Sequence, residues 1–251
     1  MSKNINLSNI PVVIFCGGKG MRIKEFEPFL PKPLIKIGRL AIVEHVMNIY
    51  KKYGSKKFII CVGFKFIEFK KYFIKRNFQQ VKKNLFIKKD LEVIIANTGL
   101  KNETGSRLKQ IYKYINFKNF FLTYGDGIGN INIKSLYNFF LKNKNILTIT
   151  GVDAPSRFGL IEVKDNIIKK FSEKPVKSKN LINGGFFVCS KEIFKYLNNK
   201  NSLNFEKDIL SKIYKIKKVY CYKHHNFWLP MDTRRDYEKL SKIYKINKFK
   251  F

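Results

Sequence analysis

A glycine-rich loop directly follows the first apolar run of the chain, in the segment VVIFCGGKGMR at residues 12–22. Gly17, Gly18 and Gly20 allow the backbone to approach an anion closely and to point N–H groups at it. Arg22 adds a guanidinium, whose planar set of donors suits phosphate oxygens. The order GGxGxR matches neither the dinucleotide fingerprint GxGxxG nor the P-loop GxxxxGK[ST]. These residues predict a phosphate site of another kind.

A lysine held between two prolines follows this loop at Pro31-Lys32-Pro33. Each proline ring fixes its own φ, so the backbone on both sides of Lys32 is stiffened. A stiffened lysine can place one cation on a phosphate. A surface loop with incidental charges is the alternative. The glycine loop, Arg22 and Lys32 together, following a strand, favour phosphate binding.

Two aspartates lie where we expect strands to end. Asp126 stands between Gly125 and Gly127 after the run NFFLTY, and Asp232 follows residues 228–231, WLPM. Such positions matter because ligands of an open α/β sheet bind outside the carboxyl ends of its strands. Asp-Gly is also common in turns, so Asp126 alone could be a turn residue. Two carboxylates from different strand ends could share one Mg²⁺, with phosphate oxygens at its remaining positions.

A second lysine, Lys174, lies in Glu173-Lys174-Pro175, between the two aspartates along the chain, and residues 183–185 read Asn-Gly-Gly. We expect Lys174 to bind a second, attacking phosphate, while Arg22 and Lys32 hold a triphosphate whose α-phosphate Mg²⁺ would bridge. Both reactants are then anionic, so their mutual repulsion must be neutralised. Positioning and electrostatic stabilisation would supply most of such a catalysis.

Strand-like and helix-like runs alternate through the first 150 residues and would position these side chains. The strand-like runs cover residues 12–18, 56–64, 90–99, 119–127 and 146–153. The helix-like runs cover residues 41–54, 66–76, 106–115 and 133–143. Alternation at these lengths predicts βαβ units in an α/β fold: a Rossmann-like, mostly parallel sheet sandwiched by helices.

The second half of the chain is richer in strands. Two short strands, 157–163 and 166–174, flank a hairpin signal at residues 164–166, and further strands are expected at 182–190 and 217–230. Helical patterns cover residues 191–197, 204–215 and 233–245. With no linker or repeat in view, we predict one domain over 1–251 with a small β-rich appended part. Its nucleotide half covers about 10–130 and its acceptor half about 131–251.

Composition excludes several classes of protein. In 251 residues, 45% hydrophobic and 15% aromatic content indicate a globular chain rather than a disordered one. No run approaches the roughly 18 apolar residues of a membrane span, and the N-terminus is too polar for a secretory signal. We therefore expect a cytoplasmic protein without membrane insertion. The cysteines are predicted to be buried free thiols because none lies in a CxxC pair: Cys16, Cys61, Cys189 and Cys221.

The net charge of +33 does not by itself indicate nucleic-acid binding. The 51 basic residues are spread over the whole chain, and only seven of them are arginines. A nucleic-acid binder is expected to cluster its basic residues on one face, with arginine well represented. Lysine with abundant Asn and Ile is instead typical of an AT-rich genome. We expect no specific nucleic-acid partner, although diffuse positive charge attracts nucleoside triphosphates.

The motifs GGKGMR, PKPLIKIG, TGSRLK, TYGDG, RFG, EKP, INGGFFV and FWLPMDTRRD run from Val12 to about Tyr244. With them the chain resembles the sugar-phosphate nucleotidyltransferases, most closely the glucose-1-phosphate cytidylyltransferase branch. The resemblance implies a Mg²⁺-dependent enzyme that joins CTP to a small phosphorylated acceptor, such as glucose-1-phosphate or another hexose-1-phosphate. The products would be a CDP-linked compound and pyrophosphate, made for bacterial surface polysaccharide or capsule biosynthesis.

The resemblance also assigns roles to residues. Those implied for the nucleotide are Gly17, Gly18, Gly20, Arg22, Thr104, Gly105, Arg107 and Gly125. Among them, Arg22 would contact the leaving pyrophosphate, while Lys32 would stabilise charge at the α-phosphate. Those implied for the acceptor are Glu173, Lys174, Asn183 and Gly184, with Lys174 on its phosphate. The implied Mg²⁺ ligands are Asp126 and Asp232.

The chain departs from this family at the segment of about 78–91, which is shorter than in typical glucose-1-phosphate cytidylyltransferases. There the longer segment helps to bind nucleotide and contacts a neighbouring subunit, so the acceptor and a homo-oligomeric state stay open. A non-sugar acceptor such as phosphoglutamine, or thymidylyl or guanylyl transfer, is the alternative within the same chemistry. A catalytically idle nucleotide sensor is the alternative in another class, which the intact set of charged residues disfavours.

Overall fold

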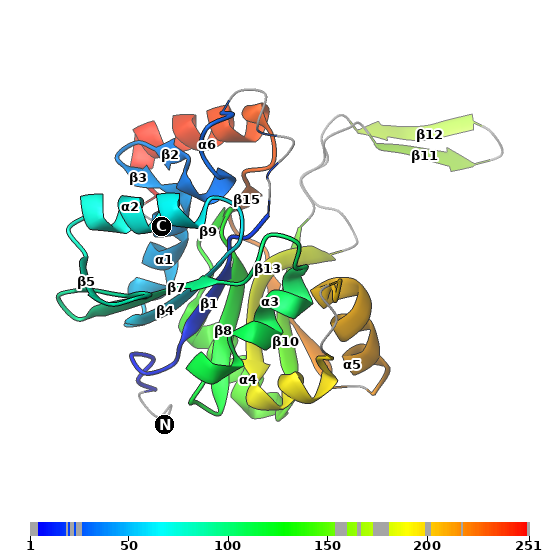
Figure 1. The fold of residues 1–251 in the computed structure, drawn as a ribbon. Helices are drawn as coiled ribbons and strands as arrows, with labels where there is room; N and C mark the ends of the chain where they lie inside the picture. Colours follow the sequence, from blue (N-terminus) through cyan, green and yellow to red (C-terminus); the bar gives the residue numbers. More distant parts are fainter. Residues whose placement is uncertain are drawn as a thin grey trace.

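A nine-stranded mixed sheet forms the centre of the computed structural model, which describes residues 5–18, 20, 23, 27–153, 160–164, 167–172, 181–198, 202–216 and 218–249 (Figure 1). The order of strands across the sheet is β14-β10-β13-β8-β1-β4-β7-β6-β5. Their bounds are β1 Val12–Phe15, β4 Lys57–Val62, β5 Gln79–Lys82, β6 Leu85–Lys88, β7 Leu91–Asn97, β8 Asn119–Tyr124, β10 Leu147–Asp153, β13 Leu181–Ser190 and β14 Val219–His224. Only β6 and β13 run against the others in this sheet, which confirms the mostly parallel α/β fold.

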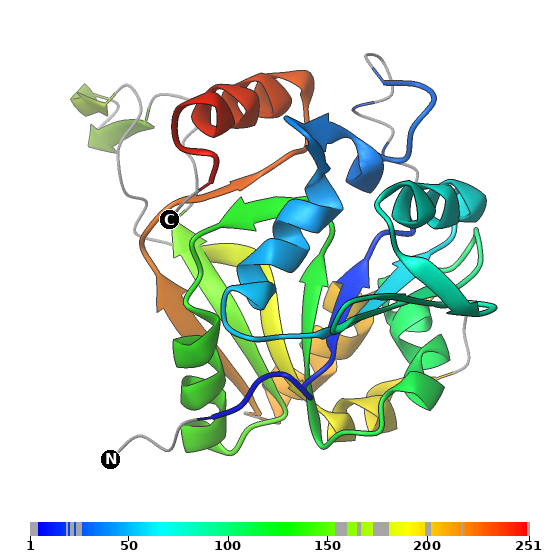
Figure 2. The same cartoon turned by 90° about the vertical axis from the view of Figure 1, so that its left-hand side faces the viewer.

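Helices cover both faces of the sheet. The α-helices are α1 Ile42–Lys51, α2 Phe66–Lys75, α3 Thr104–Gln110, α4 Ile133–Asn143, α5 Ser211–Lys215 and α6 Arg234–Asn247. Shorter helical turns are η2 Lys32–Leu34, η3 Tyr112–Tyr114, η4 Lys191–Tyr196 and the π-helical η5 Phe205–Leu210. Figure 2 shows α1 and α2 in front of the sheet. None of these described helices is long and apolar enough to cross a membrane.

The core is divided by the sheet into two layers, which the first strand shows directly. Val12 and Ile14 of β1 belong to the layer under α1, α2, α4 and α6. Val13 and Phe15 belong to the layer under α3, η5 and α5. All four are buried because side chains alternate between the faces of a strand that is covered on both sides. Apolar and polar residues therefore do not alternate along β1.

Three small two-stranded sheets accompany the central one. They are β2 Lys36–Ile37 with β3 Leu40–Ala41, β9 Gly127–Gly129 with β15 Trp228–Pro230, and β11 Leu160–Lys164 with β12 Ile167–Ser172. The expected hairpin strands in the second half correspond to β11 and β12. The strand expected at 217–230 is divided in the structure: β14 joins the central sheet, while β15 pairs with β9.

One sequence prediction needs correction, and one element was missed. Cys16, Cys61 and Cys189 are buried free thiols as expected, but Cys221 is exposed. It lies on β14, an edge strand on which most side chains are exposed or half-buried, so an apolar run there does not guarantee burial. The shortened segment around 78–91 forms the hairpin β5–β6, which extends the opposite edge of the sheet and was not predicted.

Candidate active site

A cavity of about 630 Å³ opens at the carboxyl ends of three parallel strands, β1, β7 and β8. Its walls come from the segments that follow these strands, as expected for an open α/β sheet. The lining residues are Phe15, Cys16, Gly17, Gly18, Gly20, Lys32, Pro33, Leu100, Lys101, Asn102, Glu103, Thr104, Arg107, Tyr124, Gly125 and Asp126. Most residues predicted for the nucleotide thus surround one cavity.

Arg107 ties the glycine loop to the segment after β7. The residue is 4% exposed, and its guanidinium donates to the carbonyl oxygen of Gly17 at 3.0 Å, to that of Gly99 at 2.8 Å and to Thr98 Oγ1 at 2.8 Å. A Cβ at Gly17 would lie 2.1 Å from the guanidinium carbon, so only glycine fits there. Burial lowers the pKa of Arg107, which nevertheless stays protonated in proteins. Predicted to lie beside base and ribose, this side chain also fixes the wall of the cavity.

The residues before Arg107 dock on the chain just ahead of η5. Thr104 Oγ1 accepts a hydrogen bond from the backbone N–H of Phe205 at 2.9 Å. Gly105 packs so closely on Leu203 that a Cβ would lie 2.8 Å from its carbonyl oxygen. Gly105 is therefore needed for helix α3 to approach this segment, and it does not line the cavity. Thr104 does line it.

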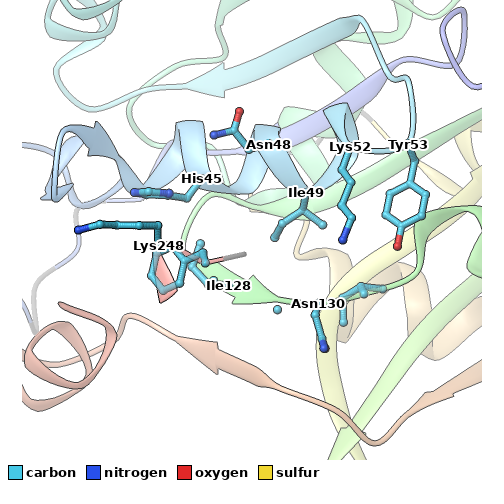
Figure 3. A pocket seen from close by; sticks show the side chains of 11 residues that line it. His45, Asn48, Ile49, Lys52, Tyr53, Ile128, Asn130 and Lys248 are labelled. Carbon is cyan, nitrogen blue, oxygen red and sulfur yellow. The ribbon is translucent and has the colours of Figure 1, made fainter. Parts of the chain in front are cut away.

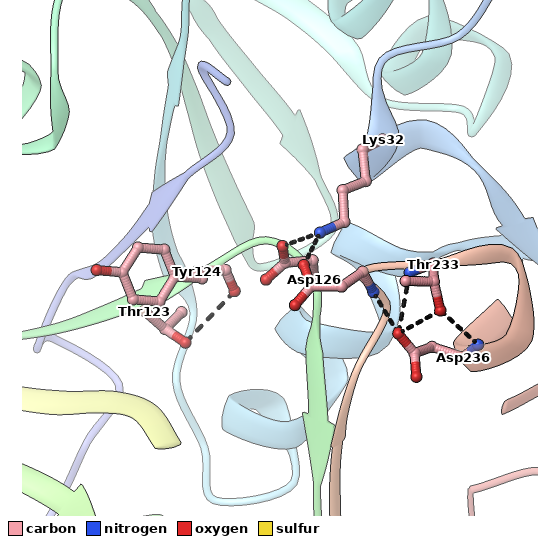
Figure 4. A network of polar contacts seen from close by, with 7 residues as sticks. Lys32, Thr123, Tyr124, Asp126, Thr233 and Asp236 are labelled. Carbon is pink, nitrogen blue, oxygen red and sulfur yellow. Dashed lines mark hydrogen bonds and ion pairs between the residues drawn. The ribbon is translucent and has the colours of Figure 1, made fainter. Parts of the chain in front are cut away.

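The ammonium of Lys32 lies between the two aspartates predicted as metal ligands (Figure 4). Lys32 Nζ is 2.6 Å from Asp126 Oδ2 and 2.7 Å from Asp232 Oδ1. Burial alone would lower the pKa of Lys32, but the charges and hydrogen bonds of Asp126 and Asp232 outweigh it and raise the pKa above its usual value. Lys32 is therefore a cation at neutral pH, held in two charge-assisted hydrogen bonds.

Backbone pairing explains why two aspartates so distant in sequence meet. Gly127, which begins β9, pairs with Pro230 at the end of β15. The backbone N–H of Met231 then donates to the carbonyl oxygen of Asp126 at 2.9 Å. Asp126, just before β9, and Asp232, just after β15, consequently lie next to each other at the same end of this small sheet. The sequence analysis selected both residues, but it did not foresee the small sheet that brings them together.

Asp236 is a positioning residue that the sequence analysis missed. Its Oδ2 accepts from the backbone N–H of Asp232 at 3.1 Å, and from the N–H and hydroxyl of Thr233 at 2.9 and 2.8 Å (Figure 4). Thr233 and Asp236 form a capping box at the start of α6. The signal was present in the sequence, since TRRD at 233–236 has the required spacing of cap and third helical residue.

The donor set at Asp126 and Asp232 fits Mg²⁺. Carboxylate oxygens are hard ligands, and Mg²⁺ in phosphate-transferring sites is commonly bound through one or two carboxylates plus substrate phosphates. Among the residues that the structure describes, no group of three or more His, Cys, Asp or Glu forms an all-protein metal cage. Two carboxylates beside a cavity of about 630 Å³ therefore match the needs of a metal that arrives with a phosphate-bearing substrate.

Two of the predicted acceptor residues, Asn183 and Gly184, lie near the start of β13. Asn183 Oδ1 accepts from the backbone N–H of Gly185 at 2.9 Å, and the carbonyl of Gly184 accepts from Trp228 Nε1 at 2.8 Å. A Cβ at Gly184 would lie 2.6 Å from Val152 Cγ1, which explains the glycine. Trp228 belongs to β15, so the acceptor residues connect to the strand that leads to Asp232.

Three predicted site residues, Arg22, Glu173 and Lys174, lie outside the described residues. A second, smaller cavity of about 100 Å³ lies between α1, β9 and the C-terminal residues Lys248 and Phe249 (Figure 3). Its lining includes His45 and Asn130 but none of the predicted site residues. The larger cavity is therefore the candidate active site.

Comparison with known proteins gives one family and several relatives. A family model described as nucleotidyl transferase matches residues 11–245. A probable glucose-1-phosphate cytidylyltransferase of Bacillus subtilis strain 168 is 35% identical over 242 residues, covering 92% of this chain and 95% of the relative. A glucose-1-phosphate cytidylyltransferase of Salmonella typhimurium strain LT2 is 33% identical over 236 residues, covering 89% and 91%. A D-glycero-alpha-D-manno-heptose 1-phosphate guanylyltransferase of Campylobacter jejuni is 26% identical over 226 residues, covering 90% and 96%.

Solved structures share the fold. HddC from Yersinia pseudotuberculosis superposes with a TM-score of 0.69 at 24% identity, covering 94% of this chain and 99% of its own. A putative glucose-1-phosphate thymidylyltransferase from Bacillus anthracis gives a TM-score of 0.73 at 16% identity, covering 94% and 96%.

Proposed function

The chain belongs to the nucleotidyl transferase family and is a sugar-phosphate nucleotidyltransferase of the cytidylyltransferase type, and we propose that it joins CTP to a hexose-1-phosphate with the help of Mg²⁺. Glucose-1-phosphate is the proposed acceptor, and CDP-glucose and pyrophosphate are the proposed products. A supply of activated sugar for surface polysaccharides is the proposed use. One observation carries the reaction: Lys32, Asp126 and Asp232 meet at the edge of a cavity walled by a glycine loop.

The nucleotide half of the site supports binding of a triphosphate. Gly17, Gly18 and Gly20 line the cavity without side chains, so a phosphate can approach their backbone. Arg107 fixes this loop through the carbonyl of Gly17. In the proposed complex Lys32 supports negative charge at the α-phosphate.

The proposed displacement forms one bond and breaks another. An oxygen of the acceptor phosphate attacks the α-phosphorus of CTP, and the bond from that phosphorus to the bridging oxygen of pyrophosphate breaks. An ionised phosphate is already a nucleophile, so the chain needs no general base and has only to orient and neutralise the reactants. Mg²⁺, held by Asp126 and Asp232, would supply further charge neutralisation.

The remaining predicted site residues complete the proposal. We assign Arg22 to the leaving pyrophosphate and Lys174 to the acceptor phosphate. Glu173, Asn183 and Gly184 are assigned to the polar groups of the acceptor. Guanylyl transfer to a heptose-1-phosphate is the second candidate, because relatives with that activity match most of the chain.

A pyrophosphate-release screen tests the proposal. CTP, dTTP, UTP and GTP are each offered with glucose-1-phosphate, other sugar-1-phosphates including heptose-1-phosphate, and small non-sugar phosphates, with Mg²⁺ or EDTA. We expect release with CTP and a hexose-1-phosphate in Mg²⁺ only. Preference for GTP with the heptose phosphate would establish the second candidate instead.

A pair of aspartate variants localises the activity. Asp126→Asn should lower kcat at least about 100-fold, a typical loss when a group that stabilises transition-state charge is removed. Asp90→Asn is the matched control, since the Asp90 side chain is 61% exposed and pairs with Lys56 far from the cavity lining. Full turnover by Asp126→Asn with CTP and Mg²⁺ would remove Asp126 from the mechanism.

A further inference from the structure

We propose that Lys32 guards the metal site: in the free enzyme its ammonium holds the place between Asp126 and Asp232, and it gives up that place only when a triphosphate enters the cavity. The inference rests on the proposed function in taking these two aspartates as ligands of a divalent metal. It goes further in two ways. Lys32 moves from the aspartate pair to the triphosphate, and the triphosphate therefore binds before the metal.

The contacts of the ammonium carry the first step. Lys32 Nζ lies within 2.7 Å of both aspartates, and its side chain is only 12% exposed (Figure 4). A divalent cation held by both carboxylates would lie close to the same pair of side chains. Lys32 and a divalent cation therefore compete for one space, and if both were present their like charges would repel at close range.

The backbone of Lys32 cannot leave, but its side chain can turn. Pro31 and Pro33 flank it, and the N–H of Ile35 donates to its carbonyl at 3.1 Å. Pro33 is buried, which anchors the turn. Four side-chain torsions lie between this fixed backbone and Nζ, so the ammonium can move by rotation alone.

The second proposed partner of Lys32 is a phosphate bound at the glycine loop, which lies beside the aliphatic part of the Lys32 side chain. The Cβ of Lys32 would be only 3.0 Å from a Cβ at Gly20, whose φ is +60° and which has no side chain to obstruct it. Lys32 thus runs along the glycine loop and lines the cavity with Gly17 and Gly18. Phosphates bound at that loop would attract the ammonium away from the aspartates. Binding of the triphosphate would thereby free Asp126 and Asp232 from the ammonium, so that they could bind a metal.

Metal binding without nucleotide tests this arrangement. The free aqueous Mn²⁺ ion gives an EPR signal that disappears on binding, so affinity can be measured on the full chain without any substrate. We expect Lys32→Gln to bind Mn²⁺ about tenfold more tightly than wild type or better, because the competing cation and its charge-assisted hydrogen bonds are gone. A catalytic lysine that merely supported the metal site would show the opposite change.

Control variants separate the site from the overall charge. Lys36→Gln removes one exposed lysine close in sequence, and its Mn²⁺ affinity should equal that of wild type. The gain should disappear when Asp126→Asn is added to Lys32→Gln. Lys32→Met, which keeps an unbranched stem without charge, should show the same gain as the glutamine variant.

The outcomes are distinct. Equal or weaker Mn²⁺ binding by Lys32→Gln and Lys32→Met overturns the inference. If either variant unfolds because two carboxylates have lost their counter-ion, refolding on addition of Mn²⁺ supports it, and failure to refold at millimolar Mn²⁺ overturns it. Failure of this test alongside CTP turnover leaves the proposed function in place. If the variants rank in Mn²⁺ affinity as expected but the enzyme does not turn over CTP, the inference stands and the proposed nucleotide is rejected.

Discussion

Replacing Arg107 by methionine should both destabilise the fold and misplace the glycine loop. The substitution removes three hydrogen bonds, to the carbonyls of Gly17 and Gly99 and to the hydroxyl of Thr98. A buried acceptor without a partner costs about 1–3 kcal/mol. We take the lower value because Gly17 lines the open cavity, where water can replace the lost donor. Three acceptors at about 1 kcal/mol each give a loss of about 3 kcal/mol.

Urea unfolding followed by circular dichroism measures this loss, and the KM for CTP measures the loop. We expect the midpoint to fall, and the KM to rise at least about tenfold because the wall of the cavity is no longer fixed. Arg107→Lys keeps the charge but replaces the planar set of guanidinium N–H donors by one ammonium group. It should therefore recover only part of the lost stability and only part of the change in KM for CTP. This variant separates charge from geometry.

Arg234→Met is the matched control for the loss of an arginine. Arg234 is 74% exposed and pairs with Glu238 one helical turn away, so its replacement should change stability by less than about 0.5 kcal/mol. If Arg107→Met unfolds at the same urea concentration as wild type, the three hydrogen bonds do not hold the loop. If stability falls but the KM for CTP does not change, the loop does not bind the nucleotide.

Three further predictions follow from the local geometry. Gly20→Ala should lose about 1–2 kcal/mol in thermal unfolding, because φ is +60° and the new Cβ would press on Lys32 at 3.0 Å, whereas Gly18→Ala, with open space around it, should lose little. Asp236→Ala should lose about 1 kcal/mol through the broken capping box, and equal melting temperatures of variant and wild type would contradict this. Burial lowers the pKa of His45, so the native state prefers the neutral ring. Its contribution to stability should be complete above about pH 6.5 and should decrease as the pH falls below that value. His45→Gln should therefore flatten the pH dependence of the unfolding free energy below about pH 6.5, and an unchanged slope there would count against it.

Much of the central sheet could be predicted from periodicity. The apolar run at β1 and the helical spacing in α1 and α4 depend on residues near in sequence, so the pattern is visible without the structure. The two strands that run against the rest, β6 and β13, could not be recognised in this way. Strand direction depends on which neighbour a strand joins, and nothing local to Leu181–Ser190 encodes that choice.

The site was predictable in its residue types but not in its contacts. Asp126 and Asp232 were chosen because carboxylates follow apolar runs. Their common contact with Lys32 spans 94 and 200 residues of sequence, and no motif relates positions so far apart. Arg107 was chosen by resemblance, and its hydrogen bonds to backbone carbonyls could not be read from side-chain chemistry. Asp236 could have been found from the capping-box spacing alone.

Because of the direction of β13, the residues proposed for the nucleotide and those proposed for the acceptor lie in different segments of the sequence. Parallel strands leave the sheet at the edge where the cavity opens, so the loops proposed to bind the nucleotide come after β1, β7 and β8. Because β13 is antiparallel to β8, it enters the sheet at that same edge, and Asn183 and Gly184 come at its beginning. Residues upstream of β13 can therefore change to suit a new acceptor while the nucleotide loops stay unaltered. Exchange of such segments between relatives offers a simple route to new pairs of nucleotide and acceptor.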